Sequence, residues 1–117
     1  MHISIYHNPR CGKSRAALQW LLDHGYTPTV IEYLKTPPTA QQLDELLSQL
    51  GYDDPRQLMR TKEAEYRALQ LARPELSRTQ LLHALAAHPK LIERPIVVTE
   101  RGTVIARPLE KLTELLA

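Results

Sequence analysis

The chain has no phenylalanine, a single cysteine and no long apolar run, and each of these absences excludes a class of protein. One cysteine forms no internal disulfide. One cysteine and five scattered histidines show no ligand pairs at metal-binding spacings, so no metal site is expected. No apolar run approaches the roughly 20 residues of a membrane span, and the first residues do not resemble a signal peptide. We therefore expect a cytoplasmic protein with a reduced thiol and no membrane partner.

Size and charge narrow the classes further. The 117 residues fit one compact domain, residues 1–117, with a core made of Leu, Ile, Val, Tyr and the lone Trp20. A net charge of +2 is too mild to indicate a nucleic-acid partner. Arginine outnumbers lysine by ten to five, and the guanidinium group suits two-pronged binding of oxyanions. Most of these arginines are expected on the solvated surface.

Hydrophobic periodicity predicts an α/β protein. Strands are expected over 2–6, 29–33, 96–99 and 103–106, and helices over 13–24 and 108–116. Between the second and third strands, helices are expected from an N-cap at Thr39 to Gly51, within 53–71, and from an N-cap at Ser77 to about residue 88. This βαβ…ββα order predicts a thioredoxin-like fold with a mixed four-stranded sheet, and a helical insertion of about 39–89 after the second strand.

Cys11 lies in the turn between the first strand and the first helix. Free backbone N–H groups and the helix dipole favour negative charge there, which lowers the pKa of a thiol. Lys13 and Arg15 add positive potential and are expected to stabilise the thiolate. A free cysteine is most often a small buried hydrophobic residue, but Cys11 has no aliphatic or aromatic neighbour within three residues on either side. We therefore predict a reactive nucleophile beside a loop that binds a tetrahedral anion.

The residues around Cys11 also form a Cys-x-x-Ser pattern that ends at Ser14, a monothiol version of a redox centre. His7 precedes the cysteine by four residues. It is either a partner that polarises the thiol or a turn histidine without a role, and the spacing alone does not decide between the two.

Two arginines at the ends of the terminal hairpin, Arg94 and Arg107, each precede a proline. A residue before proline favours extended backbone, and the Arg94–Pro95 bond is a candidate for the cis form. In a thioredoxin-like sheet this segment lies near the start of the first helix. Both arginines are therefore candidates for the edges of the cysteine site.

Four separated motifs resemble one known family over nearly the whole chain. They are YHNPRCGKSR at 6–15, YLKTPP at 33–38, LMR at 58–60 and HPKLIERPIVV at 88–98. These motifs resemble the short-chain branch of the glutaredoxin-coupled arsenate reductase (ArsC) family. The resemblance implies that Cys11 is the nucleophile, that Arg60, Arg94 and Arg107 surround the oxyanion, that His7 and Ser14 stabilise the thiolate, and that Pro95 is a cis-proline facing the site.

The same resemblance implies a function, the reduction of arsenate to arsenite. Two electrons require two thiols, and the chain has only one. Glutathione is therefore implied as co-substrate and glutaredoxin as the protein partner that clears the mixed disulfide. We expect a monomer with no bound cofactor. Two alternatives stay open: a redox-sensing transcription regulator that binds RNA polymerase, and a monothiol glutathione-dependent oxidoreductase acting on mixed disulfides.

Overall fold

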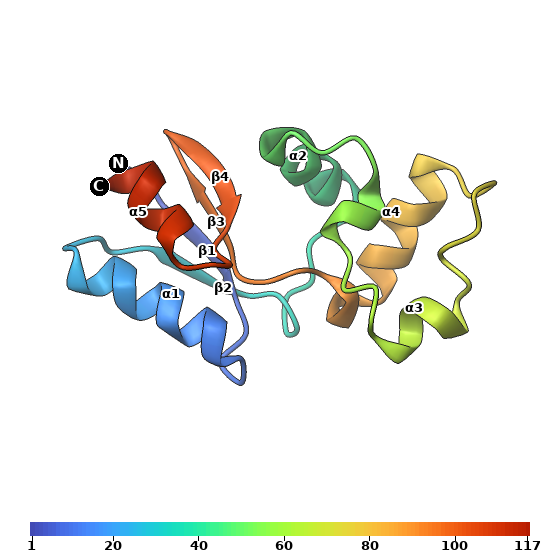
Figure 1. The fold of residues 1–117 in the computed structure, drawn as a ribbon, viewed down its shortest axis with the longest axis horizontal. Coiled ribbons are helices and arrows are strands. Elements are labelled where there is room, and N and C mark those ends of the chain that lie inside the picture. The colour runs from blue at the N-terminus through green and yellow to red at the C-terminus, as the bar shows by residue number, and fades with distance from the viewer. The chain divides into compact units, whose positions relative to one another are not determined.

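The computed structural model describes all 117 residues, and their contacts divide the chain into two compact units (Figure 1). The first unit consists of Met1–Thr36 and Arg94–Ala117 and contains the whole sheet. The second unit, Pro37–Glu93, is helical and includes the residues of the expected insertion at 39–89. None of the helices is both long and apolar enough to cross a membrane.

The sheet has four strands in the order β2-β1-β3-β4. The strands are β1 (Ser4–His7), β2 (Thr29–Glu32), β3 (Ile96–Thr99) and β4 (Gly102–Ile105). β1 pairs with β2 in parallel, whereas β1 with β3 and β3 with β4 are antiparallel. The predicted mixed sheet is therefore confirmed. One boundary matters for function, because β1 extends to His7 instead of ending at residue 6.

Helices α1 (Gly12–Asp23) and α5 (Glu110–Leu116) share one hydrophobic core with the sheet. The buried members of this core are Ile3, Ile5, Ala17, Leu21, Val97, Ala106, Leu112 and Leu116. Ala17 and Leu21 are four residues apart and therefore lie on one face of α1. Side chains alternate along a strand, so His7 extends from the same face of β1 as Ile3 and Ile5. The pattern directs His7 toward the side of the sheet that α1 covers.

The helical unit is built around α2 (Ala40–Leu50) and α4 (Arg78–Ala87), which contact each other. The predicted N-caps are confirmed. Thr39 and Ser77 each accept a hydrogen bond from the third backbone N–H of their helix. The glutamine side chain at that third position accepts a hydrogen bond from the backbone N–H of the cap residue. Gly51 ends α2 with φ of 75°, a left-handed conformation that glycine adopts without strain.

The segment 53–71, expected to be helical, is mostly irregular. It contains a 3₁₀ turn, η1 (Pro55–Leu58), and the five-residue helix α3 (Ala64–Ala68). No residue of α3 is buried, and a short helix without a packed face is marginally stable. A second 3₁₀ turn, η2 (Pro89–Leu91), follows α4 and precedes β3 in the sequence. The charged composition of residues 53–71 favours a helix, but the segment has no apolar stripe that could pack and extend the helix.

Candidate active site

The loop between β1 and α1 is a tight turn that places Cys11 at the N-cap of α1. The backbone N–H of Cys11 donates to the carbonyl of Asn8 at 3.0 Å, and the Asn8 side chain accepts from the N–H of Arg10 at 3.0 Å. Cys11 has extended backbone angles and is 9% exposed. The thiol is therefore fixed at the position where a helix begins, and a small part of it remains accessible.

Opposing effects act on the Cys11 thiol, and the net result is a lowered pKa. Burial is the largest effect and raises the pKa of the thiol. The backbone N–H of Ser14, the guanidinium of Arg94 and the backbone N–H of Lys13 together outweigh burial. The N–H groups at the start of α1 and the guanidinium of Arg94 therefore favour the thiolate.

Arg94 supplies the positive charge next to Cys11, from the segment that leads into β3. Its Nε and Nη1 atoms are buried and have no hydrogen-bond partner in the protein. Buried guanidinium donors are rarely left unpaired, and they match the acceptors of an oxyanion. The following Arg94–Pro95 peptide bond is cis. Arg94 and Cys11 therefore form a site with an ionisable sulfur and two free donors.

Beneath the loop, His7 and Ser14 form a buried pair. The Ser14 hydroxyl shares a hydrogen bond of 2.6 Å with His7 Nδ1 and accepts a second, of 3.0 Å, from the N–H of Asn8. Burial lowers the pKa of His7; Glu32 raises it in part, and Arg15 lowers it further. His7 is therefore neutral near pH 7. It contacts Ser14, and the backbone of Ser14 in turn faces Cys11.

The cations near Cys11 in the sequence act in different ways. Lys13 lowers the pKa of the thiol through its backbone N–H, and its side chain is exposed. Arg15 Nη1 donates to the carbonyl of Pro9 at 3.1 Å, so this side chain braces the loop. The expectation that both side chains stabilise the thiolate stays a prediction.

The other two arginines expected at the oxyanion are Arg107 and Arg60. Arg107 belongs to the same unit as Cys11, and Arg60 belongs to the helical unit. Arg107 is exposed and directly follows the buried Ala106. The Arg107–Pro108 peptide bond is cis, a second cis bond beside the one expected at Arg94–Pro95. The guanidinium of Arg60 pairs with Glu63. Their roles at the oxyanion stay predictions.

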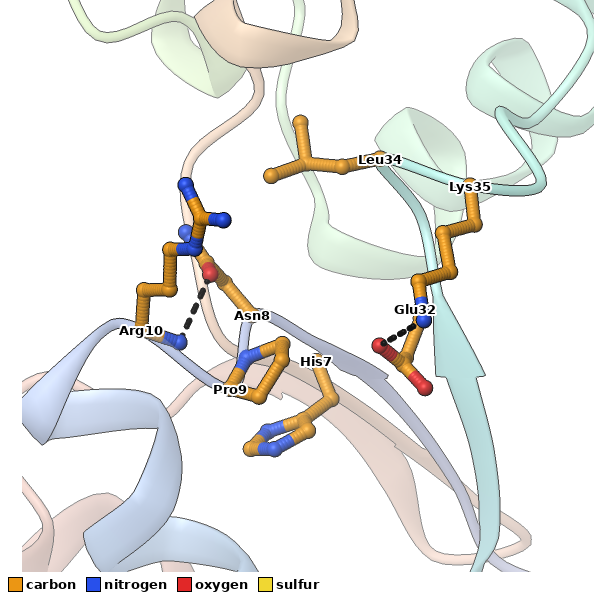
Figure 2. A pocket seen from close by; sticks show the side chains of 7 residues that line it. All are labelled: His7, Asn8, Pro9, Arg10, Glu32, Leu34 and Lys35. Atoms are coloured by element: carbon orange, nitrogen blue, oxygen red, sulfur yellow. Dashed lines mark hydrogen bonds and ion pairs between the residues drawn. The ribbon is translucent and has the colours of Figure 1, made fainter.

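Sequence reasoning missed Glu32 and the hollow next to it (Figure 2). A pocket of about 270 Å³ is lined by His7, Asn8, Pro9, Arg10, Glu32, Leu34 and Lys35. Glu32 is the register partner of His7 in the parallel β1–β2 pair, so strand pairing is the signal that could have placed it there. No cluster of three or more His, Cys, Asp or Glu side chains is arranged to hold a metal ion.

The mixed four-stranded sheet, with a cysteine of lowered pKa at the start of its first helix, defines a thioredoxin-like protein. The model of the ArsC family matches residues 6–115, and the chain belongs to this family. It is 44% identical over 114 residues to an arsenate reductase of Neisseria meningitidis, with 97% of each chain covered. It is 43% identical to an arsenate reductase of Escherichia coli, covering 98% of this chain and 81% of that one. The structure of an arsenate reductase from Vibrio cholerae superposes with a TM-score of 0.95 at 46% identity, covering 99% and 98% of the two chains.

Proposed function

We propose that the chain reduces arsenate to arsenite, with Cys11 as the nucleophile and glutathione as the source of the second thiol. The observation that carries this proposal is the pairing of the low-pKa Cys11 thiol with the two unpartnered donors of Arg94. A thiolate next to empty oxyanion-binding donors suits attack on a tetrahedral anion. The family relatives named arsenate reductase indicate which anion that is.

In the first step, the Cys11 thiolate attacks arsenic and a sulfur–arsenic bond replaces an arsenic–oxygen bond. The sulfur contributes the electron pair, two protons are taken up, and one arsenate oxygen leaves as water. The product is a thiol ester of arsenate, with arsenic still As(V). Arg94 binds the oxygens that remain, and Arg107 completes the oxyanion site in this proposal. Bidentate guanidinium contacts offset the negative charge of arsenate.

In the second step, the glutathione thiol attacks the sulfur of Cys11 and the sulfur–arsenic bond breaks. Its electron pair stays with arsenic, which becomes As(III) and leaves as arsenous acid after protonation. The two sulfurs are each oxidised by one electron and form the Cys11–glutathione mixed disulfide. Glutaredoxin then takes the glutathionyl group by thiol–disulfide exchange and restores the Cys11 thiol.

A single-turnover experiment tests this sequence. The chain is mixed with arsenate and glutathione without glutaredoxin, arsenite is quantified, and the intact mass is measured. We expect about one arsenite per chain and one glutathione on Cys11, because the mixed disulfide blocks a second cycle. Adding glutaredoxin is expected to give repeated turnover.

Controls for this experiment omit arsenate or replace it with phosphate. Phosphate has similar shape and charge but accepts no electrons from thiols, so it is expected to bind without forming the mixed disulfide. Absence of arsenite from the full mixture would contradict the proposal. Glutaredoxin-like exchange of a peptide–glutathione mixed disulfide, without arsenate turnover, would instead support the monothiol oxidoreductase.

A further inference from the structure

The pocket beside the Cys11 loop has a distribution of charge that the first reaction step does not use. On its β2 side, Lys35 Nζ lies 3.5 Å from Glu32 Oε1, which forms an exposed ion pair (Figure 2). On its loop side, Arg10 is exposed and its guanidinium has no hydrogen bond or ion pair within the protein. Pro9 and Leu34 contribute apolar surface between these ends. Leu34 is 44% exposed, which is high for a large aliphatic side chain beside a pocket.

We propose that this pocket binds the peptide part of glutathione, an inference that rests on the proposed function. Glutathione carries an ammonium and a carboxylate on its γ-glutamyl end and a single carboxylate on its glycine end. The γ-glutamyl pair complements the opposite charges of Glu32 and Lys35, and the glycine carboxylate complements the free guanidinium of Arg10. The net charge of glutathione is −1, and Arg10, Lys35 and Glu32 together carry +1.

The pocket is lined by the three residues of the turn that immediately precede Cys11. Arg10 directly precedes Cys11, so their Cα atoms are about 3.8 Å apart, and Asn8 and Pro9 of the same turn line the pocket. An extended tripeptide spans roughly 10 Å, and the cysteine of glutathione is the residue between its two charged ends. His7 lines the pocket as well and hydrogen-bonds Ser14. Bound glutathione would therefore lie against the residues that support the nucleophile.

Binding of glutathione would replace the Glu32–Lys35 ion pair with contacts to the ligand, at a small cost in free energy. The Glu32–Lys35 pair is exposed, with side-chain exposures of 38% and 78%, and such pairs contribute little to stability. The arginine at the loop has no partner to lose. Covering Leu34 and Pro9 removes apolar surface from water. The pocket thus offers charged contacts that cost little to form.

A paired change of protein and thiol tests the proposal. Steady-state KM is measured for glutathione and for its glycine ethyl ester, which has the same thiol and γ-glutamyl group but no glycine carboxylate charge. We expect Arg10→Ala to raise the KM of glutathione about tenfold, the value of one charge-assisted contact, and to leave that of the glycine ethyl ester nearly unchanged. Lys35→Ala is expected to raise both values. Lys111→Ala, which removes one positive charge from α5, is the matched control and should change neither.

Equal effects of Arg10→Ala on the two thiols, or no effect on either, would overturn the proposal. A binding measurement separates this failure from failure of the proposed function. S-methylglutathione, which cannot react, is titrated into the ¹⁵N-labelled chain without arsenate. Shifts of the amides of Arg10, Leu34 and Lys35 are expected, and their absence would overturn the pocket assignment even if the chain reduces arsenate. Such shifts in a chain without arsenate turnover would support the pocket and contradict only the proposed function.

Discussion

Cys11→Ser is expected to lower the rate of arsenite formation at least about 1000-fold, which places it below detection in a coupled assay. A serine hydroxyl is not ionised near neutral pH, so the thiolate attack on arsenic is lost. Oxygen also cannot replace sulfur in the second step, because that step ends in a sulfur–sulfur bond. The measurement is arsenite release with arsenate, glutathione and glutaredoxin all present.

The stability of the Cys11→Ser variant is the control for this experiment. Cys11 occupies the N-cap of α1, and serine is among the best N-cap residues. The free energy of unfolding in urea should therefore be unchanged or slightly higher, so lost activity would not reflect unfolding. Arsenate-dependent turnover by Cys11→Ser near the wild-type rate would remove Cys11 from the mechanism.

Arg94→Ala is expected to lower kcat/KM for arsenate by about 100- to 1000-fold, the range seen when a donor to a developing oxyanion is removed. Two effects combine in this variant. The buried Nε and Nη1 donors are lost from the oxyanion site, and a positive charge that lowers the pKa of Cys11 disappears. The measurement is the steady-state kinetics of arsenate at saturating glutathione.

Two further variants separate these effects. Arg94→Lys keeps the charge and loses the planar fork, so we expect it to retain most of the lowered pKa of Cys11 and to recover only part of kcat/KM. Arg101→Ala removes an arginine from the turn between β3 and β4 and should leave arsenate kinetics unchanged. Wild-type kinetics in Arg94→Ala would show that the arginine does not contact the substrate.

The sequence predicted the parts of the site that depend on local structure. Cys11 at the start of a helix follows from the turn at Asn8–Pro9 and the periodicity of α1, and both are local patterns. The caps at Thr39 and Ser77 were predictable for the same reason, because a capping box is complete within four residues.

The rest of the site depends on contacts between distant segments. Two donors of Arg94 are buried without a partner in the protein, and no local sequence pattern predicts this. The influence of Glu32 on His7 comes from the register of two parallel strands. The helix expected within 53–71 is present only as the short α3 and the 3₁₀ turn η1 for a related reason, since charge composition suggests helix but only packing of an apolar face extends it.

The most direct test of the account is the pH dependence of Cys11 alkylation. Because the chain has one cysteine, every reaction with iodoacetamide reports on this thiol. The rate should rise with pH as the thiolate forms, with a midpoint below that of glutathione measured in the same buffer, and Arg94→Ala should move this midpoint upward. A midpoint at or above that of glutathione would contradict the claim that the fold holds this sulfur ionised.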